Sequence, residues 1–204
     1  MTGFALKFAS FMSTTKHLIL ASQSPRRKQL LEWAEIPFDI IVHDTDESYP
    51  PSLPIDEVPA FIARAKALAV LDSLSAVDRD RPILAADTVV VVDEEIIGKP
   101  KDREDAISIL TRLSGREHRV ITGVYIQKAD HILSFSDTTR VTFHPLTYEQ
   151  ISFYVDKYKP YDKAGAYAIQ EWIGVVGIRS IDGDFYNVMG LPVSKVVQAL
   201  ETWQ

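Results

Sequence analysis

Residues 83–92 read ILAADTVVVV, an apolar run rich in valine that is interrupted only by Asp87 and Thr88. Such a run is typical of a strand that is covered on both faces, as in sheets flanked by helices. We therefore expect residues 83–92 to form the central strand of an α/β fold. Because an unpaired buried carboxylate is costly, Asp87 should pair with a cation, coordinate a metal or face a cleft. A hydrogen bond to a neighbouring loop is the alternative for this side chain.

The segments before this strand alternate between strand and helix patterns. We expect a strand at 17–21, a helix with Leu30, Leu31 and Ala34, a strand at 36–42, a proline-rich loop at 43–54 and a helix at 58–74. The buried face of the 58–74 helix is predicted to carry Phe61, Ile62, Ala65, Leu68, Ala69 and Leu71. Arg64 and Lys66 are expected to point away from that face.

The segments after the central strand complete an α/β sheet with helices packed against it. We expect a helix at 103–113, two antiparallel strands at 119–127 and 132–143, a short helix at 148–155, a strand at 175–181 and a helix at 192–203. Residues 17–204 are predicted to form a single domain. Residues 1–16 are expected to be a flexible extension, or an over-long start with Met12 as an alternative initiator.

Composition excludes several classes of protein. The chain has 204 residues, with 22 Lys and Arg against 28 Asp and Glu, a net charge of −6 and no cysteine. The acidic balance argues against a nucleic-acid partner. The lack of cysteine excludes disulfides and thiolate chemistry, and suits a reducing compartment such as the cytoplasm. The apolar runs are far shorter than the roughly 20 residues that span a bilayer, and no secretory signal fits, so no membrane partner is expected.

Familiar catalytic motifs are missing from the sequence. It contains no GxxxxGK[ST], GxGxxG, HExxH or GxSxG pattern, which removes the usual support for kinases, dehydrogenases, zinc proteases and esterases. The five histidines form no spaced pair, so any metal is expected to depend on carboxylate and water ligands.

Two arginines stand where a helix is expected to begin. Ser24 is suited to the N-cap and Pro25 to the first helical position, which puts Arg26 and Arg27 in the first turn. Cations are unfavourable there, because the helix dipole already places partial positive charge at this end. A bound phosphate would offset both charges, using backbone N–H groups and guanidinium forks together. The alternative is a solvated start of a surface helix.

Three further side chains are weaker candidates. Lys99 lies between Gly98 and Pro100, and Lys163 lies in a turn, so both could bind phosphate. A lone loop lysine is more often solvated. Gln170 follows an apolar stretch and could present its amide to a base edge, or it could be a satisfied core amide.

Taken together, five ordered motifs resemble those of the Maf family of nucleoside triphosphate pyrophosphatases. They are LILASQSPRRKQLL (18–31), AADTVVVV (85–92) followed by IIGKPKD (96–102), LSGREHRVITGV (113–124), YDKAGAYAIQ (161–170) and DGDFYNVMGLP (182–192). The resemblance implies an elongated α/β fold with two lobes around a central cleft, similar to inosine triphosphate pyrophosphatases, commonly as a homodimer. It also implies hydrolysis between the α and β phosphates with a divalent metal, Mg²⁺ or Mn²⁺.

The resemblance also implies roles for individual residues. Asp87 matches the family's proton acceptor, and the specificity positions fall on Arg26, Thr88 and Gln170. The triphosphate is expected to meet Ser24, Arg27, Lys99 and Lys163. The metal is expected at Asp87, with Glu47 as its partner. These assignments agree with the demands of phosphoryl chemistry, which needs positioning and charge stabilisation more than covalent catalysis.

The AGAYAIQ form resembles the subgroup that acts on dTTP and UTP and so prevents their incorporation into nucleic acids. Glu171 and Trp172 depart from the family pattern, in which a glycine is frequent after AIQ, and this affects the expected shape of the base pocket. Two alternatives stay open. One is a pyrophosphatase for 7-methyl-GTP or other modified nucleotides, and the other is a nucleotide-sensing regulator of cell division and septum formation.

Overall fold

A computed structural model describes residues 17–202, so the expectation for residues 1–16 lies outside the described residues. The strands are β1 (Leu18–Leu20), β2 (Phe38–Ile40), β3 (Ile83–Val92), β4 (Glu95–Ile97), β5 (Glu117–Lys128), β6 (His131–Phe143) and β7 (Ile178–Asp182). The helices are α2 (Pro25–Trp33), α3 (Val58–Ser73), α4 (Arg103–Leu113), α5 (Tyr148–Tyr158), α6 (Trp172–Gly177), α7 (Phe185–Met189) and α8 (Val193–Glu201). Three 3₁₀ turns are η1 (Ile55–Glu57), η2 (Asp78–Asp80) and η3 (Ala164–Ala166).

The strands form one mixed sheet in the order β2-β1-β3-β5-β6-β7, and β4 pairs with β3. β1 runs parallel to both β2 and β3, whereas the remaining pairs are antiparallel. β5 pairs with nearly all of β3, but on the other side β1 pairs only with residues 83–84 and β4 only with residues 90–92. Within residues 17–202 no strand pairs with residues 85–89 of β3 on this side, so the edge is open there.

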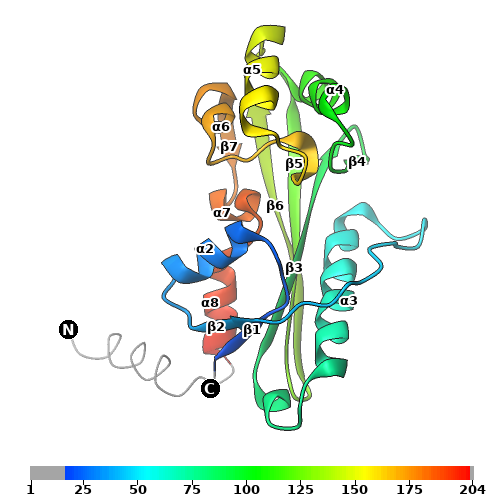
Figure 1. Cartoon of the computed structure of the whole chain (residues 1–204), viewed down its shortest axis with the longest axis vertical. Coiled ribbons are helices and arrows are strands. Elements are labelled where there is room, and N and C mark those ends of the chain that lie inside the picture. Colours follow the sequence, from blue (N-terminus) through cyan, green and yellow to red (C-terminus); the bar gives the residue numbers. More distant parts are fainter. Residues whose placement is uncertain (1–16, 203–204) are drawn as a thin grey trace, which may run out of the picture.

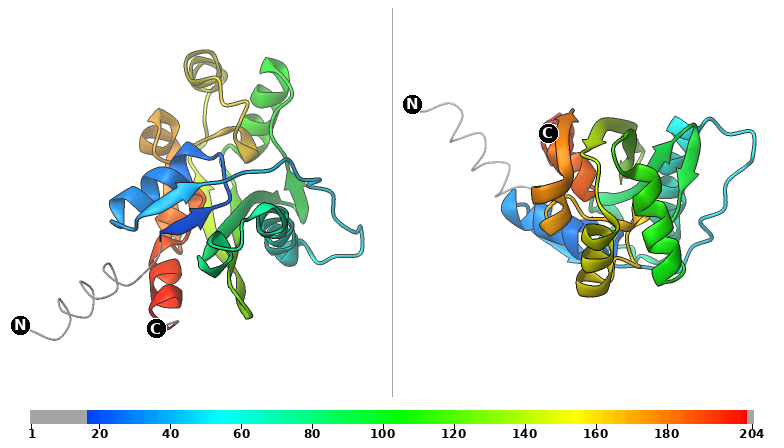
Figure 2. Two further views of the ribbon diagram at one scale, coloured as in Figure 1. Left: turned by 60° about the horizontal axis from the view of Figure 1, so that its bottom comes forward. Right: turned by 90° about the horizontal axis from the view of Figure 1, so that it is seen from above.

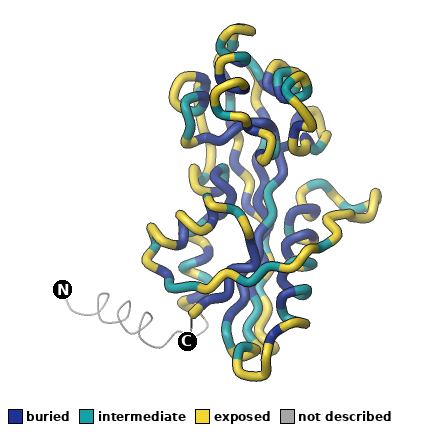
Figure 3. Tube along the Cα trace, in the orientation of Figure 1, coloured by how far each residue is buried: buried dark blue, intermediate teal, exposed yellow. Residues whose placement is uncertain are grey.

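The long strands β3, β5 and β6 connect two groups of helices (Figure 1). One end of the molecule carries α4, α5 and α6, and the other end carries α2 and α8 on one face of the sheet and α3 on the opposite face, an arrangement that the turned views also show (Figure 2). Buried backbone follows the strands between these layers (Figure 3). The structure confirms the predicted α/β class, with two lobes along one mixed sheet.

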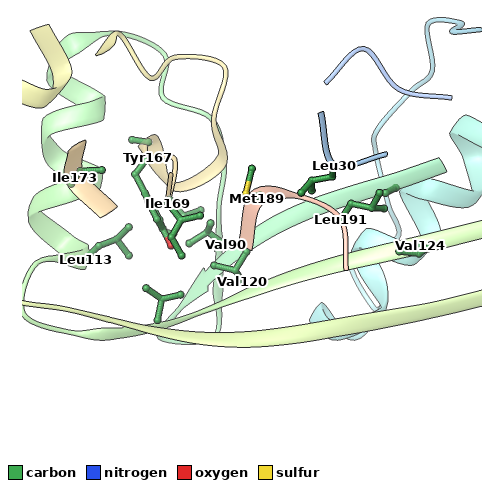
Figure 4. Close-up of a cluster of buried hydrophobic side chains, with 14 of the residues drawn as sticks. Leu30, Val90, Leu113, Val120, Val124, Tyr167, Ile169, Ile173, Met189 and Leu191 are labelled. Carbon is green, nitrogen blue, oxygen red and sulfur yellow. The ribbon is translucent and has the colours of Figure 1, made fainter. Parts of the chain in front are cut away.

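The two faces of β3 pack against different helices, because successive strand residues point to opposite faces. Ile83, Ala85, Val89 and Val91 pack with residues of α3. Leu84, Ala86, Val90 and Val92 belong to the large cluster that includes Leu30, Leu113, Met189 and Leu191 (Figure 4). By this alternation Asp87 belongs to the α3 face and Thr88 to the opposite one.

The predicted buried face of α3 was wrong. Only Ile62 of the six expected residues is buried, and Phe61 is 39% exposed. The face that packs on the sheet carries Val58, Pro59, Ile62, Ala63, Ala67 and Val70. A Cβ on Gly123 of β5 would lie 2.0 Å from the backbone N of Ala60, so helix and sheet are in very close approach. Small residues suit such a close contact better than the larger apolar residues of this almost uniformly apolar helix.

The predicted strand at 175–181 was wrong at its start. Residues 172–177 form α6, in which the N–H groups of Gly174 and Val175 bond to the Glu171 carbonyl, and β7 begins only at Ile178. The valines that suggested a strand are exposed, Val175 by 82%. Besides α6, the elements β4 and α7 were not predicted, whereas β3 has the expected bounds and the β5–β6 pair is antiparallel as expected.

Candidate active site

A cavity of about 580 Å³ lies at the open edge of β3. Its walls come from the loop that leads into α2, the loop at 42–47, α3, the η3 segment and the end of α7. Charged side chains of both signs line it, namely Arg26, Arg27, Lys66, Lys99 and Lys163 with Asp44, Glu47, Asp87 and Asp162. All the predicted site residues except Gln170 lie in this lining, and the volume suits a small organic ligand.

The cation that Asp87 requires is Lys66 of α3. Lys66 Nζ donates to Asp87 Oδ1 at 2.7 Å and lies 2.7 Å from Glu47 Oε1. The sequence had indicated that Lys66 points away from the core, but not that it reaches Asp87. The feature of the sequence that could have indicated this contact is a lysine within a largely apolar helix, in a chain that also has a carboxylate within an apolar strand. Asp87 thus both pairs with a cation and faces the cavity, two of the three expected situations.

Glu47 is held in its charged form by its neighbours. Partial burial by itself would raise the pKa of Glu47, but the hydrogen bond and charge of Lys66, with the charges of Lys99 and Arg27, keep that pKa below its ordinary value. Two carboxylates therefore converge on one ammonium group at the cavity wall.

Arg27 is buried and bonded within the protein. Its Nε donates to the Gly190 carbonyl at 2.7 Å, Nη1 to Ser22 Oγ at 3.1 Å and Nη2 to Thr88 Oγ1 at 3.0 Å. Gly190 ends α7 with φ +117, a conformation that favours glycine. Burial lowers the pKa of Arg27, and the charge of Asp87 opposes that shift. Arg27 thus connects the loop before α2, β3 and the end of α7. The described residues use three of the guanidinium's five N–H groups, which leaves two for a ligand.

The other predicted phosphate ligands lie along the same cavity. Arg26 Nη1 is 3.6 Å from Asp162 Oδ2, and Lys163 Nζ donates to Asp162 Oδ1 at 2.8 Å. Lys163 is buried, whereas Lys99 is exposed at the cavity. Ser24 occupies the N-cap of α2 as expected, although its side chain makes no capping hydrogen bond.

Gln170 is the one predicted site residue that the structure does not bring to the cavity. Its side chain is exposed, and the lining at this segment comes instead from Tyr167 and Ala168. The unusual Glu171 accepts a hydrogen bond from the Tyr154 hydroxyl and lies 3.7 Å from Lys163 Nζ. Glu171, which departs from the family pattern, therefore lies next to Lys163 in the cavity lining.

A histidine behind the cavity wall was also missed. His118 Nε2 lies 2.7 Å from the Tyr167 hydroxyl, and burial lowers the pKa of His118 to about 4, so the ring is neutral at pH 7. The rings of His118 and Phe143 lie 5.4 Å apart at a tilt of 32°. The Nδ1 atom of His118 is buried and has no hydrogen-bond partner among the described residues. His118 and Tyr167 belong to two of the motifs noted in the sequence, but nothing in the spacing of these motifs indicated that the two side chains are in contact.

The carboxylates fit a divalent cation only in part. Within residues 17–202 no group of three or more His, Asp or Glu side chains is placed to hold a metal ion. Mg²⁺, however, is commonly bound by one or two carboxylates together with substrate phosphates. Glu47 and Asp87, which already share the Lys66 ammonium group, meet that requirement.

Among residues 17–202, no helix is long and apolar enough to cross a membrane.

The fold and cavity define a class of elongated mixed-sheet α/β proteins with a polar, charged cavity between two lobes. A solved structure of the Staphylococcus aureus Ham1 protein shares this fold, with a TM-score of 0.51 and 17% identity over 93% of this chain and 100% of that one. Sequence comparison is more specific, because a family model described as "Maf-like protein" matches residues 17–203. The chain belongs to the Maf family.

Several relatives are similar over nearly their whole length. A protein of Parabacteroides distasonis is 48% identical over 185 residues, which cover 90% of this chain and 94% of the relative. A protein of Cytophaga hutchinsonii is 50% identical over 90% of this chain and 83% of the relative. A protein of Bacillus velezensis is 50% identical over 92% and 96%, respectively. Each of the three is named dTTP/UTP pyrophosphatase.

Proposed function

We propose that this protein is a nucleoside triphosphate pyrophosphatase that hydrolyses dTTP and UTP to the monophosphate and pyrophosphate. The observation that carries the proposal is the pairing of Asp87 with Lys66 in a cation-rich cavity at an open strand edge. Membership of the Maf family and the names of relatives at 48–50% identity support it. The activity removes these nucleotides before they are incorporated into nucleic acids.

In the proposed reaction, Asp87 accepts a proton from a water molecule. The water oxygen bonds to the α-phosphorus, the bond from that phosphorus to the α,β-bridging oxygen breaks, and pyrophosphate leaves with the bonding electron pair. Asp87 then releases the proton to solvent. Lys66 orients the Asp87 carboxylate through its 2.7 Å hydrogen bond and is a positioning residue rather than a reacting one.

The triphosphate is proposed to bind at the start of α2 and along the lysines of the cavity. Arg26 and Lys163 both contact Asp162, and a phosphate would replace that carboxylate as their partner. Lys99 and the remaining N–H groups of Arg27 add charge, and Ser24 stands at the helix N-terminus. Glu47 and Asp87 would hold Mg²⁺ or Mn²⁺, which neutralises phosphate charge when bound.

Substrate selectivity is proposed to depend on Arg26 and Thr88, which line the cavity. Gln170 stays a candidate through the family resemblance alone, because its side chain is exposed outside the lining.

We further propose that the protein acts in the cytoplasm as a homodimer. The lack of cysteine agrees with that compartment, and light scattering after gel filtration measures the assembly.

Product analysis tests the proposal directly. The protein is incubated with dTTP, UTP, CTP, GTP, ATP and 7-methyl-GTP, with Mg²⁺ or Mn²⁺ and then with a chelator. We expect monophosphate and pyrophosphate from dTTP and UTP, and loss of turnover in Asp87→Asn by at least about 100-fold while nucleotide affinity remains. Release of inorganic phosphate, or undiminished turnover by Asp87→Asn, would contradict the proposed reaction.

A further inference from the structure

Lys163 lies between two carboxylates at the cavity wall. Its Nζ donates to Asp162 Oδ1 at 2.8 Å and lies 3.7 Å from Glu171 Oε1. Because Lys163 is buried, its charge needs an anion close by. The Asp162 side chain is 61% exposed and also lies 3.6 Å from Arg26 Nη1, whereas the Glu171 side chain is 22% exposed. Glu171 is therefore the more deeply buried of the two anions beside Lys163.

Glu171 is held in place by a buried tyrosine of α5. The hydroxyl of Tyr154 donates to Glu171 Oε2 and accepts the N–H of Ala168 at 3.1 Å. Burial, together with the hydrogen bond and charge of Glu171, raises the pKa of Tyr154, so the hydroxyl keeps the proton that it donates. The backbone N–H of Glu171 also donates to the Ala168 carbonyl at 3.1 Å. Both the backbone and the side chain of Glu171 are thus fixed.

The two carboxylates beside Lys163 should respond differently to a phosphate. The exposed Asp162 side chain can turn into solvent when a phosphate takes its place, whereas Glu171 stays bonded to Tyr154. An ammonium group has three N–H donors, so Lys163 can bind a phosphate while it remains beside Glu171. One fixed carboxylate therefore compensates the charge of the buried lysine before and after the phosphate binds.

We propose that Glu171 is a positioning residue whose carboxylate, fixed by Tyr154, holds the Lys163 ammonium group where it binds the triphosphate. Glu171 itself is not part of the cavity lining, so it acts through Lys163 rather than by contact with the nucleotide. The inference rests on the proposed function, in which Lys163 binds phosphate. It gives a part in substrate binding to a residue that departs from the family pattern.

The test compares KM and kcat for UTP in the wild type and in Glu171→Gln. Glutamine keeps an acceptor for the Tyr154 hydroxyl but carries no charge, so Lys163 loses its fixed partner. We expect KM to rise about fivefold and kcat to stay within about twofold, because the lysine binds phosphate in the substrate and the transition state alike. In a Lys163→Met background, Glu171→Gln should change KM by less than about twofold, because its effect passes through the lysine.

Two tyrosines of α5 provide a second variant and its matched control. Tyr154→Phe leaves the charge of Glu171 but frees its carboxylate, so KM should rise about twofold to threefold. Tyr158 stacks on Tyr154, with ring centroids 5.0 Å apart, but it is not a member of the hydrogen-bonded chain from Ala168 to Glu171. Tyr158→Phe should therefore keep the wild-type KM. If urea unfolding shows that Glu171→Gln does not fold, this pair of variants carries the test.

An unchanged or lower KM in Glu171→Gln would overturn the inference, since a lower value would mean that the carboxylate only repels phosphate. An equal rise in the Lys163→Met background would overturn it too, because the effect would not pass through the lysine. Equal rises in Tyr154→Phe and Tyr158→Phe would trace the effect to the packing of α5 and have the same consequence. A wild type that cleaves neither UTP nor dTTP overturns the proposed function and this inference with it, whereas a wild type that cleaves UTP leaves the proposed function intact whichever way the variants behave.

Discussion

Replacing Lys66 by Met removes one cation from two carboxylates at once. Its Nζ lies 2.7 Å from both Glu47 and Asp87. The side chains of Lys66 and Asp87 are only 18% and 14% exposed, whereas that of Glu47 is 51% exposed. Removing one partner of a buried pair costs about 3–5 kcal/mol, and an exposed pair contributes about 0–1 kcal/mol. Because the inner pair keeps some contact with solvent, we expect the free energy of unfolding to fall by about 2–4 kcal/mol at pH 7.

This loss should become smaller in acid because of Glu47. In the wild type the pKa of Glu47 is lowered in the folded state, although burial opposes the shift, chiefly because of Lys66. Glu47 therefore stabilises the fold above its unfolded pKa of about 4.3, and this contribution is lost as the pH falls through the lower folded value. In Lys66→Met the effect of burial is no longer opposed by that ammonium. The difference between the unfolding free energies of the two proteins should therefore narrow by about 0–1 kcal/mol, the share of the exposed Glu47 pair, as the pH falls through the folded pKa of Glu47.

Urea unfolding at pH 7 and pH 4 measures both differences, and turnover of UTP measures the role of the lysine in the site. Lys66→Met should lose turnover on the order of 100-fold, because Asp87 is no longer oriented. Lys195→Met is the matched control, since Lys195 bonds at 2.6 Å to Asp137, whose side chain is 11% exposed, and neither lines the cavity. It should lose stability and keep turnover. Wild-type turnover in Lys66→Met, or an equal loss in Lys195→Met, would refute the reasoning.

Two further changes test other parts of the site. Arg26→Ala should weaken triphosphate binding by about 1.5–3 kcal/mol, the effect of one charge-assisted hydrogen bond, and calorimetric titration with a non-hydrolysable analogue measures it. An unchanged affinity would place the phosphates elsewhere. Burial lowers the pKa of His118 from 6.5 to about 4, so the unfolded chain binds more protons between these values and stability falls as pH drops through them. The expected loss is about 3 kcal/mol, and His118→Gln should remove it from the pH profile of urea unfolding, whereas the same slope in that variant would contradict the buried, neutral ring.

The elements with strong local patterns were predicted from the sequence. The β-branched run of β3 has the bounds expected at 83–92, because few other structures accommodate ten residues of this kind. The α4 helix also matches its expected range at 103–113, where Asp102 accepts a hydrogen bond from the N–H of Asp105 as an N-cap. The local pattern was ambiguous at Val175, because β-branched residues favour strands. There the backbone hydrogen bond from the Val175 N–H to the Glu171 carbonyl forms a helix instead.

Contacts between distant segments could not be predicted from spacing. A carboxylate inside β3 indicated that some cation must be near, but α3 could place several residues beside it, and the wrong buried face hid the role of Lys66. Arg27 illustrates the same limit, because its partner Gly190 is 163 residues away. Its position in the first turn of α2 suggested an unpaired cation, whereas the fold supplies a carbonyl and two hydroxyls that stabilise it.

The neighbouring residues Asp87 and Thr88 can serve one cavity only because the edge of β3 is open beside them. In a strand paired on both sides, successive side chains are separated by the sheet itself. Here β1 ends its pairing at Leu84 and β4 begins its pairing at Val90, so the cavity reaches around the edge to both faces. One face supplies a carboxylate oriented by a lysine, and the other supplies a hydroxyl that accepts a hydrogen bond from Arg27. The gap between two short strand pairings thus allows adjacent residues to play chemically different parts toward one ligand.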